Sequence, residues 1–493
     1  MKPVTLERSE YESKVYGCWL GKNIGGTLGA PLEGIKEVHN LTFYDPVPTE
    51  SAPNDDLDLQ LVWLKMLEDR GVNPRLSDFA EYWMKHLSAY PWDEYGFCIR
   101  NLARGLRPPV SGMFENDFID QMGSPIRSEI WACIAPGNPQ LAAEMAWKDA
   151  VQDHSGGEGV YGEMFLAALE SAAFVESDPK TLIDIGLQMI PSYSNVARSV
   201  KGALWLHKNG VALSEARDLI LRRFGHSDPC HAPQNLGFTI LGWLYGEGFG
   251  GKLCAAVNCG YDTDCTGATL GSILGIIGGV ESIPEEWRKP VGEGIVLHPY
   301  TRGLDKAPKT VQELTRRTVS LAEVVMASRS KIVDFGARTQ VRGNKLAGLR
   351  RNDRARKALS RDFDAATLPA SKDIEVTLHY YGDPVIFPKL PKLVGVSVEH
   401  SGIPVSAKLE LVTPLGWKVT LEGSQVHVAQ FSLVADDVSD SNTLRVRFQA
   451  EGGSGQADFV ILGPQEAGWF RPASRIATCP VCHARVESCI CPK

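Results

Sequence analysis

The stretch AAVNCGYDTDCTGATLGSILGIIGG, residues 255–279, places two aspartates directly before a helix of small and apolar residues. Asp262 and Asp264 stand at the expected start of that helix, and its glycines permit close packing against another backbone. Carboxylates at a helix start often serve as caps. Here, however, two aspartates stand with Asn258 and Gly260 directly before an almost entirely apolar helix. Burying both charges there is costly in free energy unless cations compensate for them. The stretch therefore predicts a metal site at the beginning of a closely packed helix.

A second acidic cluster, Asn54-Asp55-Asp56, heads another predicted helix. Successive side chains on a helix point about 100° apart. Asp55 and Asp56 can therefore bridge two hard cations only if partner ligands approach from another element, and we expect residues 262–264 to supply them. Glu33, which ends the glycine-rich loop GGTLGAPLEG, is a third candidate, although alone it is typical of an ordinary surface glutamate.

Residues 10–327 carry apolar side chains at three- and four-residue spacing, with short Gly and Pro interruptions. DLQLVWLKMLEDRG at 58–71 is one amphipathic helix that ends at a glycine. Similar helices are expected at 138–154, 162–177 and 311–327, and strand-like alternation is rare among them. This part is predicted to be an all-α bundle and the catalytic domain.

Length and composition exclude several classes of protein. A chain of 493 residues is long enough for about three domains. Its 43% hydrophobic and 22% charged residues, with a mean hydropathy of -0.13, indicate a globular protein. The net charge of -8 argues against nucleic acid as a partner. No apolar run approaches the roughly 20 residues of a membrane helix, and the N-terminus lacks the order of a secretory signal, so we expect a cytoplasmic protein without a membrane partner.

Residues 328–372 are predicted to be a basic linker, because eleven Lys and Arg residues fall between 328 and 361. Such a stretch can bind polyanions, but a solvated linker or a strap across an acidic bundle surface fits the acidic total better.

The hydrophobic period changes to two in the next part, residues 373–470. Seven short alternating runs separated by Gly, Pro, Asn and Asp predict a small antiparallel β-sandwich. No recognisable ligand site accompanies them, which favours a packing or interaction role over carbohydrate binding. The runs are IEVTLHYY, KLVGVSVEH, AKLELVTP, WKVTLEG, HVAQFSLVA, NTLRVRFQA and ADFVILG.

The short tail at 479–493 is rich in cysteine: Cys479, Cys482, Cys489 and Cys491 follow the pattern C-x2-C-x6-C-x-C. The first pair has the spacing with which two thiolates bind a tetrahedral Zn²⁺, and we expect a structural zinc, the alternative being a redox-sensitive tail. Four thiolates would close the coordination sphere, so a catalytic zinc is not expected there.

Three motifs together resemble a known family. GKNIGGTLGAPLEG, PNDDLDLQL and NCGYDTDCTGATLGSILGIIGG occur in the order and context of the ADP-ribosylglycohydrolase family, which includes dinitrogenase-reductase-activating glycohydrolase and the ADP-ribosyl-acceptor hydrolases. GSPIR at 123–127, DH at 153–154 and IPEEW at 283–287 support the resemblance, which covers roughly residues 14–325. It implies an orthogonal helical bundle with a central cleft that holds two Mg²⁺ or Mn²⁺ ions and binds ADP-ribose.

The resemblance also assigns roles to individual residues. The family's loop glutamate falls on Glu33, which shares with Asp56 the expected role of proton acceptor from water. The phosphate- and ribose-lining residues fall on Gly123 and Ser124, and the histidine near the substrate falls on His154, although a lone histidine at a helix end is more often a capping group. The implied metal ligands are Asn54, Asp55, Asp56, Asp262, Asp264 and Cys265.

The chain departs from the family's pattern at several positions. Cys265 stands where the family has threonine, and sulfur is a poor ligand for Mg²⁺. Thr266 does not replace it, because its side chain lies about 100° further around the helix. Asn54 also replaces a threonine but keeps a neutral oxygen donor. These changes predict an altered acceptor or substrate, or a softer metal preference. The other departures are Leu57 for a threonine, an added carboxylate at Asp58, and Gly26 for an aspartate.

The expected activity is divalent-metal-dependent hydrolysis of the glycosidic bond in ADP-ribosylated side chains or related ADP-ribose conjugates. An oxocarbenium-like transition state benefits from fixed carboxylates and an activated water. One alternative is a glycosidase or nucleosidase of the same fold that acts on another ribosyl or glycosyl substrate. Another is a non-catalytic nucleotide-binding protein. The loop at 90–97 is expected on the aglycone side, while Trp92, Trp131 and Trp147 are more typical of core residues.

Overall fold

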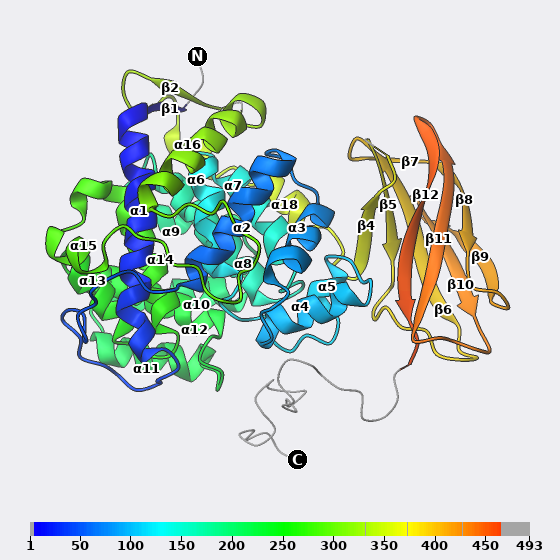
Figure 1. The fold of residues 1–493 in the computed structure, drawn as a ribbon, viewed down its shortest axis with the longest axis horizontal. Helices are drawn as coiled ribbons and strands as arrows, with labels where there is room; N and C mark the ends of the chain where they lie inside the picture. The colour runs from blue at the N-terminus through cyan, green and yellow to red at the C-terminus, as the bar shows by residue number, and fades with distance from the viewer. Residues whose placement is uncertain (1–3, 331, 372, 426, 465–493) are drawn as a thin grey trace.

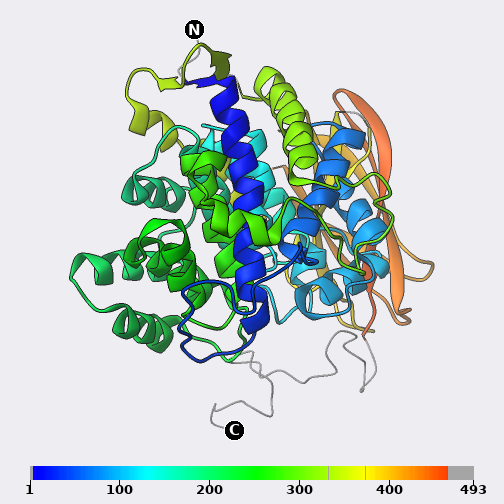
Figure 2. The ribbon, with the colours of Figure 1, turned by 60° about the vertical axis from the view of Figure 1, so that its left-hand side comes forward.

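Two helices, α1 (Arg8–Gly29) and α14 (Thr263–Gly278), lie side by side through the middle of the helical part (Figures 1 and 2). The computed structural model of the chain describes residues 4–330, 332–371, 373–425 and 427–464. The predicted zinc ligands Cys479, Cys482, Cys489 and Cys491 lie outside these described residues, so the zinc site stays a prediction.

Glycines bring α1 and α14 into backbone contact. A Cβ atom on Gly21 would lie 2.1 Å from the carbonyl oxygen of Gly271, and a Cβ on Gly25 would lie 1.9 Å from that of Gly267. The pairing runs antiparallel, so Gly29 at the end of α1 meets Thr263 at the start of α14. The Thr263 hydroxyl donates a hydrogen bond of 2.8 Å to the Gly29 carbonyl. The residues that follow α1 and those that begin α14 are therefore held at the same place.

The other helices surround this pair, and their limits agree with the apolar periodicity of the sequence. The helix expected at 58–71 begins slightly earlier, at Asp55, and ends at Gly71, whose φ of +89° is the left-handed conformation that favours glycine. The bounds are α2 Asp55–Arg70, α3 Leu76–Tyr82, α4 Asp93–Ala103, α5 Val110–Met113, α6 Ser128–Ile134, α7 Pro139–Ala150, α8 Glu158–Ala173, α9 Pro179–Leu187, α10 Asn195–Lys208, α11 Leu213–Phe224, α12 Ala232–Tyr245, α13 Gly248–Val257, α15 Glu285–Val291 and α16 Val311–Ser328. Short helical turns η1 to η4 cover Ala30–Leu32, Trp83–Leu87, Pro125–Arg127 and Val280–Ser282.

A small sheet closes one end of the helical part. Strand β1 (Val4–Glu7) pairs in parallel with β2 (Val333–Gly336) and antiparallel with β3 (Gln340–Val341). The alternation in so short a strand is too brief to be recognised in the sequence, and its partners lie more than 300 residues away along the chain.

The basic segment after α16 follows the surface of the helical part. Helix α18 (Asp353–Leu359), preceded by α17 (Lys345–Leu349), packs on α7. Arg354 Nη1 lies 2.7 Å from the carboxylate of Glu144 on α7, and Arg329 Nη2 lies 3.1 Å from the same group. The basic segment therefore contacts an acidic side chain of the helical part, as expected of a strap. The predicted domain boundaries stay predictions.

The predicted antiparallel β part is confirmed as two sheets that share one core. One has the order β4-β5-β6-β10-β9 with β7 beside β6, and the other has the order β12-β11-β8. All seven expected runs are strands; β4 and β7, which each contain a proline, were not expected. The bounds are β4 Ala365–Pro369, β5 Ile374–His379, β6 Lys392–His400, β7 Ile403–Val405, β8 Ala407–Val412, β9 Lys418–Gln425, β10 Val428–Val434, β11 Ser441–Ala450 and β12 Gly453–Leu462.

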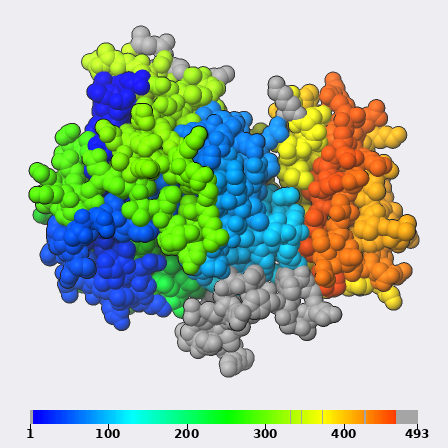
Figure 3. Space-filling model, viewed as in Figure 1, coloured from blue at the N-terminus to red at the C-terminus, as the bar shows by residue number. Residues whose placement is uncertain are grey.

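The β part is attached to the helical part through an apolar contact. Leu106, Val110 and Phe114, from the end of the α4–α5 segment, join the core of the two sheets. The two parts form adjoining lobes (Figure 3). None of the described helices is both long enough and apolar enough to cross a membrane.

Replacing Gly271 by alanine is expected to lower the free energy of unfolding by about 3 kcal/mol or more, because the added Cβ would overlap the backbone of α1. Gly251→Ala in α13 is the matched control, since a Cβ there meets no atom within 4 Å, and its effect should stay within about 1 kcal/mol. Chemical denaturation followed by circular dichroism measures both. Equal stabilities of the two variants would contradict the role of the glycine contact.

Candidate functional site

Two helix starts supply the acidic residues of the site. Asp55 and Asp56 occupy the first turn of α2, and Asp262 caps α14, whose first turn contains Asp264. Asp56 and Asp262 are fully buried, and Asp264 is 9% exposed. Such carboxylates fit a helix N-terminus, where the backbone N–H groups carry partial positive charge.

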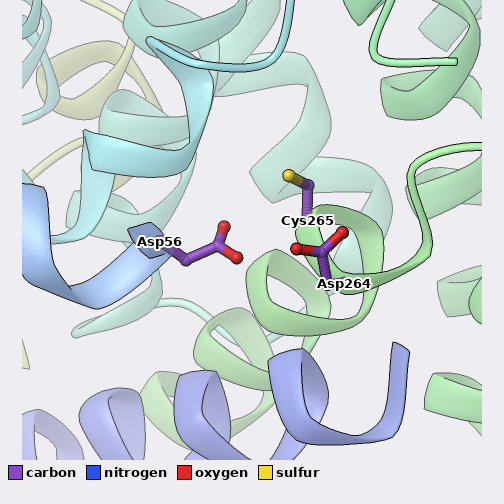
Figure 4. A group of neighbouring side chains, drawn as sticks. All are labelled: Asp56, Asp264 and Cys265. Atoms are coloured by element: carbon purple, nitrogen blue, oxygen red, sulfur yellow. The ribbon is translucent and has the colours of Figure 1, made fainter. Parts of the chain in front are cut away.

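Asp56 reaches from α2 toward Asp264 and Cys265 on α14 (Figure 4). One oxygen of each carboxylate and the Sγ atom of Cys265 all lie within 4.8 Å of one another. Both oxygens of Asp56 and Oδ1 of Asp264 are buried without a hydrogen-bond partner among the residues that the structure describes. The sequence-predicted grouping of α2 and α14 residues is therefore present as a compact cluster of acidic and sulfur donors.

The electrostatics of this cluster fit a bound divalent cation. Burial raises the pKa of Asp56 and of Asp262 well above the ordinary range, and it raises that of Asp264 to about 7, with neighbouring carboxylates adding to each shift. Burial also raises the pKa of the Cys265 thiol, as do Asp262 and Asp264. A bound cation stabilises the ionised form of these carboxylates, because its positive charge compensates for their lost solvation and for their mutual repulsion.

Glu33 lies at the rim of the cluster, just after η1. The residue is exposed, yet the loss of solvation around its carboxylate, followed by the charges of Asp55 and Asp56, raises its pKa to about 7. The charge of Glu33 in turn raises the pKa values of Asp262 and Asp264. The three acidic motifs of the sequence thus meet in one place.

Asn54 caps α2 and packs against α1. A Cβ atom at Gly26 would lie 2.4 Å from Nδ2 of Asn54. Gly26 and Asn54, at two positions where the sequence departs from the family pattern, are therefore in contact. The absence of a side chain at Gly26 makes room for the side chain of Asn54.

Gly123, Ser124 and His154 form a neighbouring group with Glu94, the second residue of α4. A Cβ on Gly123 would lie 1.8 Å from Oε1 of Glu94, so a side chain there would displace the Glu94 carboxylate. The buried Ser124 hydroxyl donates to the carbonyl of Gly159, at 2.9 Å. Burial raises the pKa of the Cys230 thiol, and the nearby charges of Asp262 and Glu94 add to the shift.

His154 is a buried, charged residue in a loop rather than a helix cap, since α7 ends at Ala150. Its Nδ1 lies 2.9 Å from Oδ1 of Asp153, and its Nε2 lies 3.5 Å from Oε1 of Glu94. Burial alone would lower the pKa of His154, but the Asp153 and Glu94 carboxylates outweigh it and raise the pKa to about 9. Arg127 in turn contacts Asp153 at 2.8 Å and donates to the Gly123 carbonyl at 2.6 Å, which ties His154 to Gly123.

The sequence motifs did not single out Lys22, a fully buried residue of α1. Its Nζ lies 2.8 Å from Oε1 of Glu129 and 3.6 Å from Oδ1 of Asp56. Gln60 donates to the other oxygen of Glu129 at 2.8 Å. Its place inside the motif GKNIGGTLGAPLEG was the available signal, because a charge in a stretch of small and apolar residues requires a partner when it is buried.

Four rings gather beside Asp55 and Asp58. His298 stacks on Tyr90 and on Tyr300, with ring centroids 5.7 and 4.9 Å away, and the two tyrosine rings are themselves 5.5 Å apart. Trp92 meets the ring of Tyr300 edge-on at 4.8 Å. The backbone N–H of His298 donates to Asp58, and the charge of His298 lowers the pKa of Asp55 against the larger effect of burial. Trp92 is half-buried and belongs to this cluster, whereas Trp131 and Trp147 are core residues as expected.

Comparison with known proteins yields three findings. The family model described as ADP-ribosylglycohydrolase matches residues 7–325. An uncharacterized protein of Archaeoglobus fulgidus is 24% identical over 326 residues, which are 63% of this chain and 99% of that protein. A chain of a solved structure titled "ADP-ribosylglycohydrolase-related protein complex" is 20% identical, with a TM-score of 0.46, and the match covers 64% of this chain and all of that one.

Lys22→Met is expected to lower the free energy of unfolding by about 3–5 kcal/mol, because it leaves Glu129 and Asp56 buried without their cation. Adding Glu129→Gln should recover part of the loss. Lys65→Met is the control, since Lys65 pairs with Asp69 at a partly exposed position and its loss should cost less than about 1 kcal/mol. Urea denaturation measures all three, and a Lys22 effect no larger than that of Lys65 would show that the buried charges need no lysine.

The raised pKa of His154 makes stability depend on pH. The ion pairing of His154 stabilises the folded state fully below the unfolded pKa near 6.5, and this contribution is lost as pH rises through about 9. We therefore expect the stability of the wild type, relative to His154→Gln, to fall between about pH 6 and pH 10. Denaturation at a series of pH values tests this, and a constant difference would mean that His154 is neutral when folded.

Proposed function

Since the chain belongs to the ADP-ribosylglycohydrolase family, we propose that it is a divalent-metal-dependent hydrolase that cleaves the glycosidic bond of ADP-ribosylated side chains or related ADP-ribose conjugates. The observation that carries the proposal is the cluster of buried, mutually repelling carboxylates on two facing helix starts, with Asp56 and Asp264 as its centre. A protein that only recognised a nucleotide would have no need to bury such charges together.

The metal ligands in this proposal are the residues of the cluster. Asp55 and Asp56 on α2, with Asp262 and Asp264 on α14, would hold two divalent ions, and Asn54 and Cys265 would complete the set. Bound there, the ions supply positive charge that orients the vicinal hydroxyls of a ribose and makes a water more acidic.

Proton transfer and transition-state stabilisation fall to side chains of the chain itself. Glu33 is the better placed proton acceptor of the two candidates, because its carboxylate lies at the exposed rim, whereas that of Asp56 is enclosed between Lys22 and Asp264. The negative charge of Asp55 and Asp56 would stabilise the oxocarbenium character that develops on the sugar.

Gly123, Ser124 and His154 would line the rest of the substrate site. The Glu94 carboxylate occupies the space beside Gly123, so Gly123 would contact the substrate only through its backbone. The charge of His154 is paired with Asp153 and Glu94, so this residue would hold those carboxylates in position.

A second candidate activity, cleavage of another ribosyl or glycosyl substrate on the same fold, is favoured by the ring cluster beside Asp55. Trp92, His298 and Tyr300 are partly exposed and offer stacking surfaces that would suit a nucleobase or a sugar as leaving group. Mass spectrometry after incubation with arginine- and serine-ADP-ribosylated peptides, with Mg²⁺, Mn²⁺ or a chelator, separates the two activities. Release of free ADP-ribose only with metal supports the first; no release from folded protein that binds divalent ions supports the second.

Asp264→Asn is expected to reduce ADP-ribose release by about a hundredfold or more without unfolding the helical part, because it removes a charged ligand and preserves its shape. Asp218→Asn, at an exposed position on α11, is the matched control and should retain the wild-type rate. Wild-type turnover in Asp264→Asn would remove the metal mechanism.

A further inference from the structure

Resting on the proposed function, we infer that the ion held by Asp56, Asp264 and Cys265 is a thiophilic transition-metal ion of the Zn²⁺, Co²⁺ or Fe²⁺ class, bound through the Cys265 sulfur, rather than Mg²⁺. The cluster combines two carboxylate oxygens with one sulfur. Mg²⁺ demands near-ideal octahedral oxygen coordination, whereas thiolate ligands select softer ions.

The spacing of the three donors suits a single ion. Two ligand atoms that each lie about 2.0–2.3 Å from a zinc-like ion are separated by no more than about 4.6 Å. The Asp56 oxygen, the Asp264 oxygen and the Cys265 Sγ are already within 4.8 Å of one another. Small side-chain movements would bring all three into contact with one ion.

The two threonine hydroxyls in the first turn of α14 are turned toward backbone carbonyls. The hydroxyl of Thr263 donates to the Gly29 carbonyl at 2.8 Å, and that of Thr266 donates to the Thr263 carbonyl at 3.1 Å. Both residues are fully buried and hold their hydroxyls against backbone oxygens. Beside Asp264, this turn therefore presents a thiol to the facing helix α2.

The surroundings of Cys265 differ from those of the other cysteines in the described helices. Cys18, Cys98 and Cys133 are fully buried in the apolar core, and Cys254 is 4% exposed there. Cys265 is only partly buried and faces two carboxylates. Part of the Cys265 side chain packs against the apolar core, and its thiol beside the two carboxylates completes a mixed oxygen and sulfur ligand set.

The test is titration of full-length protein with Co²⁺, followed by the sulfur-to-cobalt charge-transfer absorption in the near ultraviolet. Wild type, Cys265→Thr and the control Cys254→Ser are compared; the four C-terminal cysteines contribute equally to all three and cancel in the differences. We expect the control to match the wild type, and Cys265→Thr to lack part of the absorption and to bind Co²⁺ about tenfold or more weakly. Identical spectra for wild type and Cys265→Thr would overturn the inference.

Competition with Mg²⁺ provides the second readout. Circular dichroism checks that each variant is folded, and Cys265→Ser replaces Cys265→Thr if the latter does not fold. Mg²⁺ should displace little Co²⁺ from the Cys265 site of the wild type, and Cys265→Thr should bind Mg²⁺ more tightly than the wild type. Unchanged or weaker Mg²⁺ binding in Cys265→Thr would place the sulfur outside the ligand set. A sulfur–cobalt band without ADP-ribose release under any metal would contradict the proposed function and leave this inference standing. Metal-dependent release of ADP-ribose without the band would support the proposed function and overturn this inference.

Discussion

The backbone contact between α1 and α14 is the constraint on which the rest of the helical part depends. Glycines spaced four residues apart on both helices, such as Gly21 facing Gly271, let the two backbones touch along their length. The contact fixes the axial register of the helices, because any larger side chain would collide with a carbonyl oxygen. That register brings the loop after α1 beside the first turn of α14, and Glu33 thereby reaches Asp262 and Asp264.

Close packing at the centre also explains why charge compensation is so important in this fold. With little room for water, a carboxylate such as Asp56 has only other side chains or a bound ion to offset its desolvation. Lys22 provides part of this on one side, while the other side faces Asp264 and Cys265. Lys22 is therefore a permanent internal cation on the core side of Asp56, and the proposed metal ion would lie on the opposite side.

Local sequence patterns predicted the helices and most strands because those elements carry their own periodicity. The end of α2 at Gly71 is an example, since a single residue there requires φ > 0. The sheet of β1 with β2 and β3 was missed because its short strands are defined by distant partners. At the site, the acidic motifs were visible in the sequence, but Lys22 and Glu94 were not, because their significance comes only from burial beside Asp56 and Gly123.

The position of the β part connects it to the site through one segment. Glu94, the second residue of α4, lies beside Gly123 and His154, and the chain that follows α4 inserts Leu106 and Val110 into the core of the two sheets. The same short segment thus contacts the residues proposed to line the substrate site and anchors the β part through its apolar side chains.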